Sequence, residues 1–133
     1  MTLHDLARVG VIVVDHGSRK AESNAMLDEF VELFKKLTRW TIIEAAHMEI
    51  AEPSISQAFD RCVAKGADYV VIVPYFLSRG RHVQQDIPQL ALEAAEKHQT
   101  AGVKYVVAEP IGVDNLMVRL IDLRVKAALS RES

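Results

Sequence analysis

The stretch Tyr69–Phe76, with the sequence YVVIVPYF, predicts a β-strand more strongly than any other part of the chain. β-Branched and aromatic residues fill it without a charge, which is typical of a strand covered on both faces. The stretch Val9–Asp15, VGVIVVD, has the same character. Thr41–Met48 is more mixed, which places it nearer an edge of the sheet, and Lys104–Ala108 fits a short fourth strand.

Amphipathic stretches alternate with these strands and predict four helices: Glu22–Leu37, Pro53–Lys65, Ile87–His98 and Asp114–Leu129. The first predicted helix carries one apolar stripe, made of Met26, Phe30, Leu33, Phe34 and Leu37. The stripe of the last predicted helix is made of Leu116, Leu120, Leu123 and Ala127.

The ends of the two middle helices carry recognisable residues. Pro53 is tolerated in the first turn of its helix, and Gly66 suits the position just after the helix ends. Asp86 is a good N-cap for the next helix, whose Pro88 is harmless in the first turn.

Alternation of strands and helices predicts right-handed β-α-β crossovers and a parallel sheet. We therefore expect an α/β fold, a small doubly wound sheet of four parallel strands with helices on both faces. Residues 1–133 form a single domain in this interpretation. In such folds, ligands bind beyond the carboxyl ends of the strands.

The composition restricts the function. The chain has 16 Lys and Arg against 18 Asp and Glu, a net charge of −2, which argues against a dedicated nucleic-acid binder. Cys62 is the one cysteine, so no intrachain disulfide or CxxC site exists and a reducing compartment is expected. No membrane span is predicted. The expected location is the cytoplasm, or the chloroplast stroma if a transit peptide has been removed.

Three polar residues follow the predicted strand ends at equal spacing. His16, Glu49 and His82 are each 33 residues from the next, one β-α unit. In a parallel sheet they converge on one rim, and two imidazoles with a carboxylate are a common ligand set for a divalent metal. His47 lies two residues before Glu49 and either faces the ligand or caps the strand.

Other nearby residues have both an ordinary and a functional interpretation. Gly17-Ser18 could be a plain turn or an anion-binding turn with free N–H groups. Arg79 and Arg81 could be solvated loop charges or clamps for carboxylates. Cys62 is expected to fill the core.

The strings VDHGSR (14–19), ESNAMLDEF (22–30), AHMEIAEPSI (46–55) and PYFLSRGRHVQQDIPQL (74–90) resemble the small single-domain class II chelatases. The resemblance is strongest to the plant and cyanobacterial type of sirohydrochlorin ferrochelatase, followed by the small cobaltochelatases. Because it runs from about Val9 to the last helix, it implies a chelatase half-domain that inserts a divalent metal into sirohydrochlorin without ATP.

The resemblance also implies roles for individual residues. His16, Glu49 and His82 would bind the metal, and the substrate would be a tetrapyrrole with eight carboxylates. The family further implies a homodimer. From the residues themselves we hypothesise that the two histidines also accept protons, because imidazole is basic near neutral pH. We further expect the substrate to be bound by Ser18, Arg19, His47, Arg79 and Arg81. The charge balance and the short apolar runs predict no nucleic-acid or membrane partner.

This chain also departs from the family that it resembles. Val83 stands where many relatives have tryptophan. No cysteine follows Cys62, so no iron–sulfur cluster is expected. No other cofactor is expected either. The metal is expected to be Fe²⁺, with Co²⁺ or Ni²⁺ as alternatives, because all three accept these ligands. A phosphoryl-transfer enzyme with His16 as nucleophile would leave Glu49 and His82 without a role. A non-catalytic metal or tetrapyrrole carrier would need the same ligands and stays open.

Overall fold

The computed structural model describes residues 5–78, 80 and 85–132; Arg79, Arg81 and His82 lie outside the described residues. Four parallel strands form one sheet in the order β2-β1-β3-β4, so β2 is the edge strand that its mixed sequence predicts. The elements in chain order are η1 (Leu6–Arg8), β1 (Val9–Asp15), α1 (Ala21–Leu37), β2 (Ile42–His47), α2 (Ile55–Ala64), β3 (Tyr69–Pro74), α3 (Ile87–Glu96), η3 (Gln99–Ala101), β4 (Lys104–Val107) and α4 (Asn115–Glu132).

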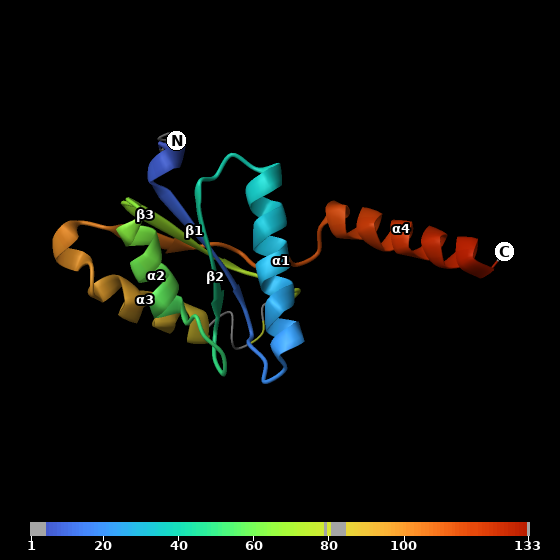
Figure 1. The fold of residues 1–133 in the computed structure, drawn as a ribbon, viewed down its shortest axis with the longest axis horizontal. Helices are drawn as coiled ribbons and strands as arrows, with labels where there is room; N and C mark the ends of the chain where they lie inside the picture. Colours follow the sequence, from blue (N-terminus) through green and yellow to red (C-terminus); the bar gives the residue numbers. More distant parts are fainter. Residues whose placement is uncertain (1–4, 79, 81–84, 133) are drawn as a thin grey trace.

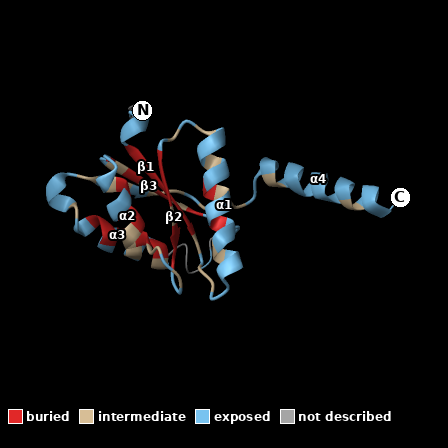
Figure 2. Ribbon diagram, in the orientation of Figure 1, coloured by how far each residue is buried: buried red, intermediate tan, exposed pale blue. Residues whose placement is uncertain are grey.

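The two faces of the sheet bury separate hydrophobic clusters. Alternate residues of β1, such as Ile12 and Val14, pack with α2 and α3 on one face. Val11 and Val13 pack with α1 on the other. Figure 2 shows buried residues concentrated in the strands and in the helix faces turned to them. The predicted doubly wound α/β fold is therefore confirmed.

The start of α2 and the cap of α3 differ from prediction, whereas α3 begins at Ile87 as predicted. Helix α2 begins at Ile55, after Pro53, because the Ser54 hydroxyl and the Gln57 side chain form a reciprocal capping box. Asp86 immediately precedes α3, but its backbone is already helical and its side chain makes no capping hydrogen bond. The Gly66 prediction is confirmed, since its φ of +103° follows the end of α2.

The predicted apolar stripes of α1 and α4 do not form the core. Leu27 and Val31 are the buried residues of α1, with Phe30 and Phe34 beside them. The remaining stripe residues of α1 are exposed: Met26, Leu33 and Leu37. Helix α4 has no buried residue and projects away from the sheet (Figure 1). Among the described residues, no helix is long and apolar enough to cross a bilayer.

Cys62 fills the core between β1 and α2, as predicted. A methyl group on Gly10 would lie 2.8 Å from its Cβ, so the strand and helix need glycine to approach this closely. Burial, together with the nearby Glu44 carboxylate, raises the pKa of the Cys62 thiol to about 12. It is therefore inert at neutral pH and unsuited to be a metal ligand or nucleophile.

We expect iodoacetamide at pH 8 to alkylate Cys62 at least about 100-fold more slowly in the native protein than in urea. The native thiol is both buried and protonated, whereas unfolding restores an ordinary thiol. Mass spectrometry of timed samples measures both rates. Equal rates in the two conditions would contradict this placement of the side chain.

Candidate metal centre

The carboxyl ends of β1 and β2 lie side by side and hold the loops that follow them together. Asp15 and His47 are partners in the sheet register. Beyond them, the Met48 N–H donates to the Asp15 carbonyl at 2.9 Å and the Glu49 N–H donates to the His16 carbonyl at 3.2 Å. These bonds extend the pairing past the strand ends, so the backbone itself brings His16 and Glu49 together.

His16 and Glu49 form a polar pair on this rim. The Nε2 atom of His16 lies 2.9 Å from Oε1 of Glu49, and both side chains are about half exposed, at 46% and 51%. The imidazole also lies near the Phe76 ring, with centroids 6.2 Å apart. The structure thus brings together two of the three predicted metal ligands. Among the described residues there is no group of three or more His, Cys, Asp or Glu able to hold a metal.

His47 lies beneath this pair, not in the open rim. Its side chain is 3% exposed, and its Nδ1 is 2.6 Å from Oδ1 of Asp15. A buried imidazole needs such a partner, because an unpaired polar group in the core is costly. This position favours support of the β1 and β2 ends over contact with substrate, and the predicted substrate role of His47 stays a prediction.

The turn after β1 is not an open anion cradle. The Ser18 N–H donates to Oδ1 of Asn24 at 2.9 Å, and the Ser18 carbonyl accepts from Nδ2 of the same residue at 2.7 Å. The anion-binding alternative, which needs a free N–H, is therefore wrong at Ser18, and the plain-turn alternative holds there. The Ser18 hydroxyl oxygen accepts from the Lys20 N–H at 3.0 Å and can still donate its own proton. Arg19 is exposed on the same turn.

Asp86 is a further carboxylate of this rim that the sequence interpretation missed. It lines a hollow of about 330 Å³ together with Glu49, Met48, Gln89 and Leu90. Sequence alone suggested a helix cap, because an aspartate just before a helix is usually one. Its place directly after the stretch with the predicted ligand His82 was the available signal for a functional position.

An apolar hollow of about 690 Å³ adjoins the other side of the rim. Phe30 and Tyr75 stack in it with ring centroids 4.5 Å apart, and Phe76 links it to His16. Leu77 and the first turns of α4 complete its wall. The rim therefore joins a polar pair to a surface suited to a flat, largely apolar ring system.

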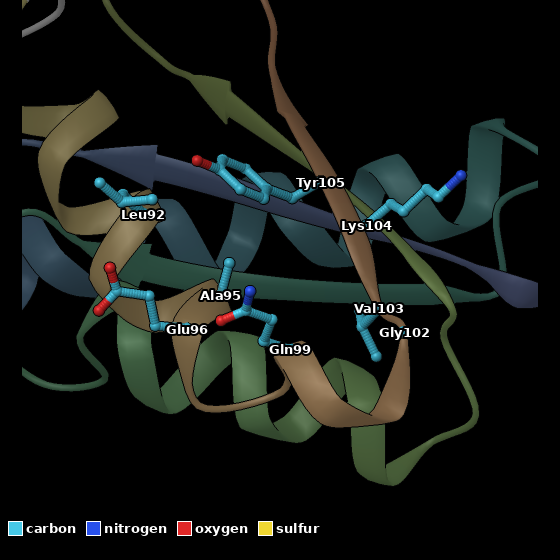
Figure 3. A pocket seen from close by; sticks show the side chains of 8 residues that line it. All are labelled: Leu92, Ala95, Glu96, Gln99, Gly102, Val103, Lys104 and Tyr105. Atoms are coloured by element: carbon cyan, nitrogen blue, oxygen red, sulfur yellow. The ribbon is translucent and has the colours of Figure 1, made fainter.

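Another hollow, of about 430 Å³, lies at the opposite end of the sheet (Figure 3). It is bounded by α3 and the beginning of β4, and its charged side chains are Glu96 and Lys104. It contains no histidine and lies at the amino ends of the strands, away from the end where such folds bind ligands.

A family model and individual relatives of known name match most of this chain. The protein-family model CbiX matches residues 10–128. The chloroplastic sirohydrochlorin ferrochelatase of Arabidopsis thaliana is 49% identical over 121 residues, which cover 91% of this chain. This chain spans only about half of that relative, 53% of its length. The sirohydrochlorin cobaltochelatase of Sulfolobus acidocaldarius is 33% identical, and the match covers 93% of this chain and 95% of the relative.

Solved structures show the same fold. A CbiX protein from Marinobacter aquaeolei VT8 matches with a TM-score of 0.78 and 30% identity, covering 92% of this chain and 98% of that one. The sirohydrochlorin chelatase SirB of Bacillus subtilis subspecies spizizenii, in complex with cobalt, matches with a TM-score of 0.83 and 28% identity. That match covers 90% of this chain but 50% of SirB. A second SirB structure, with Fe³⁺, has the same TM-score, and its match covers 91% of this chain and 47% of SirB.

Proposed function

The chain belongs to the CbiX family, and on that premise we propose that it is a sirohydrochlorin chelatase, which inserts Fe²⁺ into sirohydrochlorin to give sirohaem without using ATP. The observation that carries this proposal is the His16–Glu49 pair at the carboxyl ends of β1 and β2. Iron is favoured because the Arabidopsis relative, 49% identical, is a ferrochelatase.

The pair has a spacing that a metal ion can use. Two ligand atoms that are each about 2.0–2.2 Å from one ion lie roughly 2.8–3.6 Å apart when the angle at the metal is about 90–109°. The 2.9 Å between Nε2 of His16 and Oε1 of Glu49 lies within this range. In our proposal the ion replaces the hydrogen bond between them, and His82 supplies a third ligand. Two imidazoles and one carboxylate leave positions open for the incoming pyrrole nitrogens.

Insertion exchanges two pyrrole protons for one M²⁺, so the site must accept protons as well as release the ion. Imidazole suits both steps because it is basic near neutral pH and binds metals when neutral. His16 and His82 would take the pyrrole protons as each loses its bond to the ion. Because His16 is half exposed, protons can pass to water.

The substrate would lie across the rim, with one face of its ring against the hollow of Phe30, Tyr75 and Phe76. Its carboxylates would meet Arg19, Arg79, Arg81 and the Ser18 hydroxyl. A protein with a net charge of −2 does not attract an eight-fold carboxylate as a whole, so local cations must hold it.

Co²⁺ or Ni²⁺ insertion is the alternative reaction, since the Sulfolobus relative is a cobaltochelatase. We expect no cofactor besides the metal substrate, no iron–sulfur cluster, and no nucleic-acid or membrane partner. The compartment we propose is the cytoplasm, or the chloroplast stroma by analogy with the chloroplastic Arabidopsis relative.

The direct test is anaerobic incubation of the protein with sirohydrochlorin and Fe²⁺, Co²⁺ or Ni²⁺, followed by absorption spectroscopy. A chelatase forms many metallated products per subunit, whereas a carrier stops at stoichiometric binding. Reactions without protein measure spontaneous insertion. A rate equal to that background with every metal would overturn the proposed activity.

Arg81→Ala should raise the KM for sirohydrochlorin by about tenfold while leaving Co²⁺ binding to the protein nearly unchanged. A charge-assisted hydrogen bond contributes about 1.5–3 kcal/mol when desolvated and less when exposed, and about 1.4 kcal/mol equals tenfold. The effect should shrink in high salt, where screening has already weakened the contact. Steady-state kinetics and a Co²⁺ titration measure both quantities. An equal loss of Co²⁺ affinity would show that Arg81 supports the metal ligands and does not bind the substrate carboxylates.

We also propose that the chain acts as a homodimer. Its sheet has edge strands, β2 and β4, and unprotected edges favour association. The match to half of SirB supports this, because a second copy supplies as much protein as the remainder of that longer chelatase.

A further inference from the structure

The edge strand β2 buries two polar side chains. In the part of the chain that the structure describes, Glu44 and His47 are the buried polar or charged residues. Polar groups in a core are costly unless they are hydrogen-bonded, so each needs a partner. Glu44 lies in the middle of the strand and pairs with Lys65 at 2.5 Å. His47 is the last residue of β2, at the end of the strand that carries the proposed metal ligands.

The imidazole of His47 joins β2 to β1. Its Nδ1 atom is 2.6 Å from Oδ1 of Asp15, which is also its register partner on β1. Hydrogen bonds to a carboxylate are among the stronger ones. Because β2 has a neighbouring strand on one side only, this bond helps to fix the carboxyl end of β2 against β1. The ring is only 3% exposed, so it cannot meet a substrate carboxylate outside the protein.

The backbone of His47 closes the loop that carries Glu49. The His47 N–H donates to the Pro53 carbonyl at 2.8 Å, so residues 48–53 form a loop that leaves His47 and returns to it. Figure 1 shows the chain turning back from β2 toward α2 here. The next N–H, of Met48, points the other way and donates to the Asp15 carbonyl at 2.9 Å. A shift of His47 would therefore move both ends of this loop.

Within the loop, Glu49 is held by a strained turn. The Ala51 N–H donates to the Glu49 carbonyl at 2.8 Å and closes a three-residue turn around Ile50. Ile50 has a φ of +73°, which a β-branched residue rarely adopts. Its side chain is exposed, so burial in the core does not explain this conformation. Such strain persists where the surrounding structure imposes it, and it clusters at functional sites.

We propose that Asp15 and His47 are positioning residues, which act through the loop of residues 48–53 to hold Glu49 at its metal-binding distance from His16. This role rests on the proposed function and adds what keeps the ligands in place before the ion arrives. A preformed site has less order to gain on binding, and a group misplaced by about 1 Å can lower a rate about 100-fold. In this role His47 serves the metal ion and not the carboxylates of the tetrapyrrole.

His47→Leu keeps a side chain of similar size and removes its hydrogen bond. It should raise the Kd for Co²⁺ and lower the kcat of metal insertion, each at least about tenfold, and change the KM for sirohydrochlorin less than about twofold. His47→Asn should restore most of the affinity, because its amide N–H can take the place of Nδ1–H. The visible absorption of bound Co²⁺, which reports the arrangement of its ligands, should change in the first variant and return in the second.

Asp15→Ala tests the pair from its more accessible side, since 24% of the Asp15 side chain is exposed and folding depends on it less. It should match His47→Leu, and the double variant should be no worse than either single variant, because the two residues act as one unit. Glu44→Leu is the matched control. It also replaces a buried polar side chain of β2 with leucine, but one that pairs with Lys65, and should leave Co²⁺ affinity unchanged.

Titration with Co²⁺ in the absence of sirohydrochlorin measures affinity, steady-state kinetics give kcat and KM, and circular dichroism compares stabilities. Wild-type Co²⁺ affinity in both His47→Leu and Asp15→Ala, or an equal loss in Glu44→Leu, would overturn the positioning role. So would a raised KM for sirohydrochlorin with unchanged Co²⁺ binding, which would assign His47 to the substrate. A wild-type protein whose Co²⁺ binding depends on His47, but which inserts no metal, would support the positioning role and overturn the proposed activity alone. A wild-type protein that binds no Co²⁺ would overturn both.

Discussion

His16→Ala should lower the rate of metal insertion at least about 100-fold and leave the free energy of unfolding within about 0.5 kcal/mol of the wild-type value. The side chain is half exposed, so its removal leaves no buried cavity. It would, however, remove both a ligand of the ion and a base for a pyrrole proton. Initial rates with sirohydrochlorin and Co²⁺, and thermal unfolding followed by circular dichroism, measure the two effects.

His98→Ala is the matched control. Its Nε2 atom also lies close to a carboxylate, 2.7 Å from Oδ1 of Asp60, but its ring stacks on Phe59 of α2, outside the proposed metal site. This variant should keep the wild-type rate. Glu49→Gln should resemble His16→Ala, since it keeps the shape of the side chain and removes its charge. Full activity in either His16→Ala or Glu49→Gln would remove that residue from the mechanism.

The convergence of His16 and Glu49 was predictable from sequence for a geometric reason. Parallel strands bring their carboxyl ends to one edge, so a polar residue placed after each strand must reach the same rim. The apolar run of β1 defines the end before His16 clearly, because that strand is buried between helix layers. The more mixed sequence of β2 defines the end before Glu49 less sharply. The backbone hydrogen bonds that continue the pairing past Asp15 and His47 were not predictable, because they leave no residue pattern in the sequence.

The outward stripes of α1 and α4 were not predictable in the same way. Periodicity shows that a helix has an apolar face, but not whether its own chain or another covers that face. The stripe of α1 contains both inward Phe34 and outward Leu33, and Leu27 and Val31 decide which side meets the sheet. Likewise, the sequence does not show that the Ser18 N–H is bonded, because its acceptor is the side chain of Asn24, six residues further along the chain.

The rim depends on how closely the two loops approach. Gly17 adopts a φ of +96°, which favours glycine, and it lies directly against the loop that carries Glu49. A methyl group added to Gly17 would lie 1.9 Å from the Glu49 carbonyl oxygen and 3.3 Å from Cβ of His47. The first distance is far inside van der Waals contact with backbone, so the loops would have to separate.

Gly17→Ala should therefore destabilise the protein by roughly 2–5 kcal/mol, combining backbone strain with the overpacked contact. This corresponds to a fall in the unfolding midpoint of about 10 °C or more for a domain of this size. The rate of metal insertion should fall at least about tenfold, because His16 and Glu49 then lose their 2.9 Å spacing.

Gly66→Ala separates the backbone strain from the close contact, since Gly66 also has a positive φ, +103°, but no atom lies within 4 Å of an added methyl group. Gly66→Ala should lower the free energy of unfolding by about 1–2 kcal/mol and leave the insertion rate unchanged. If Gly17→Ala were no more destabilising than Gly66→Ala, the close approach of the two loops would not be what holds the metal ligands together.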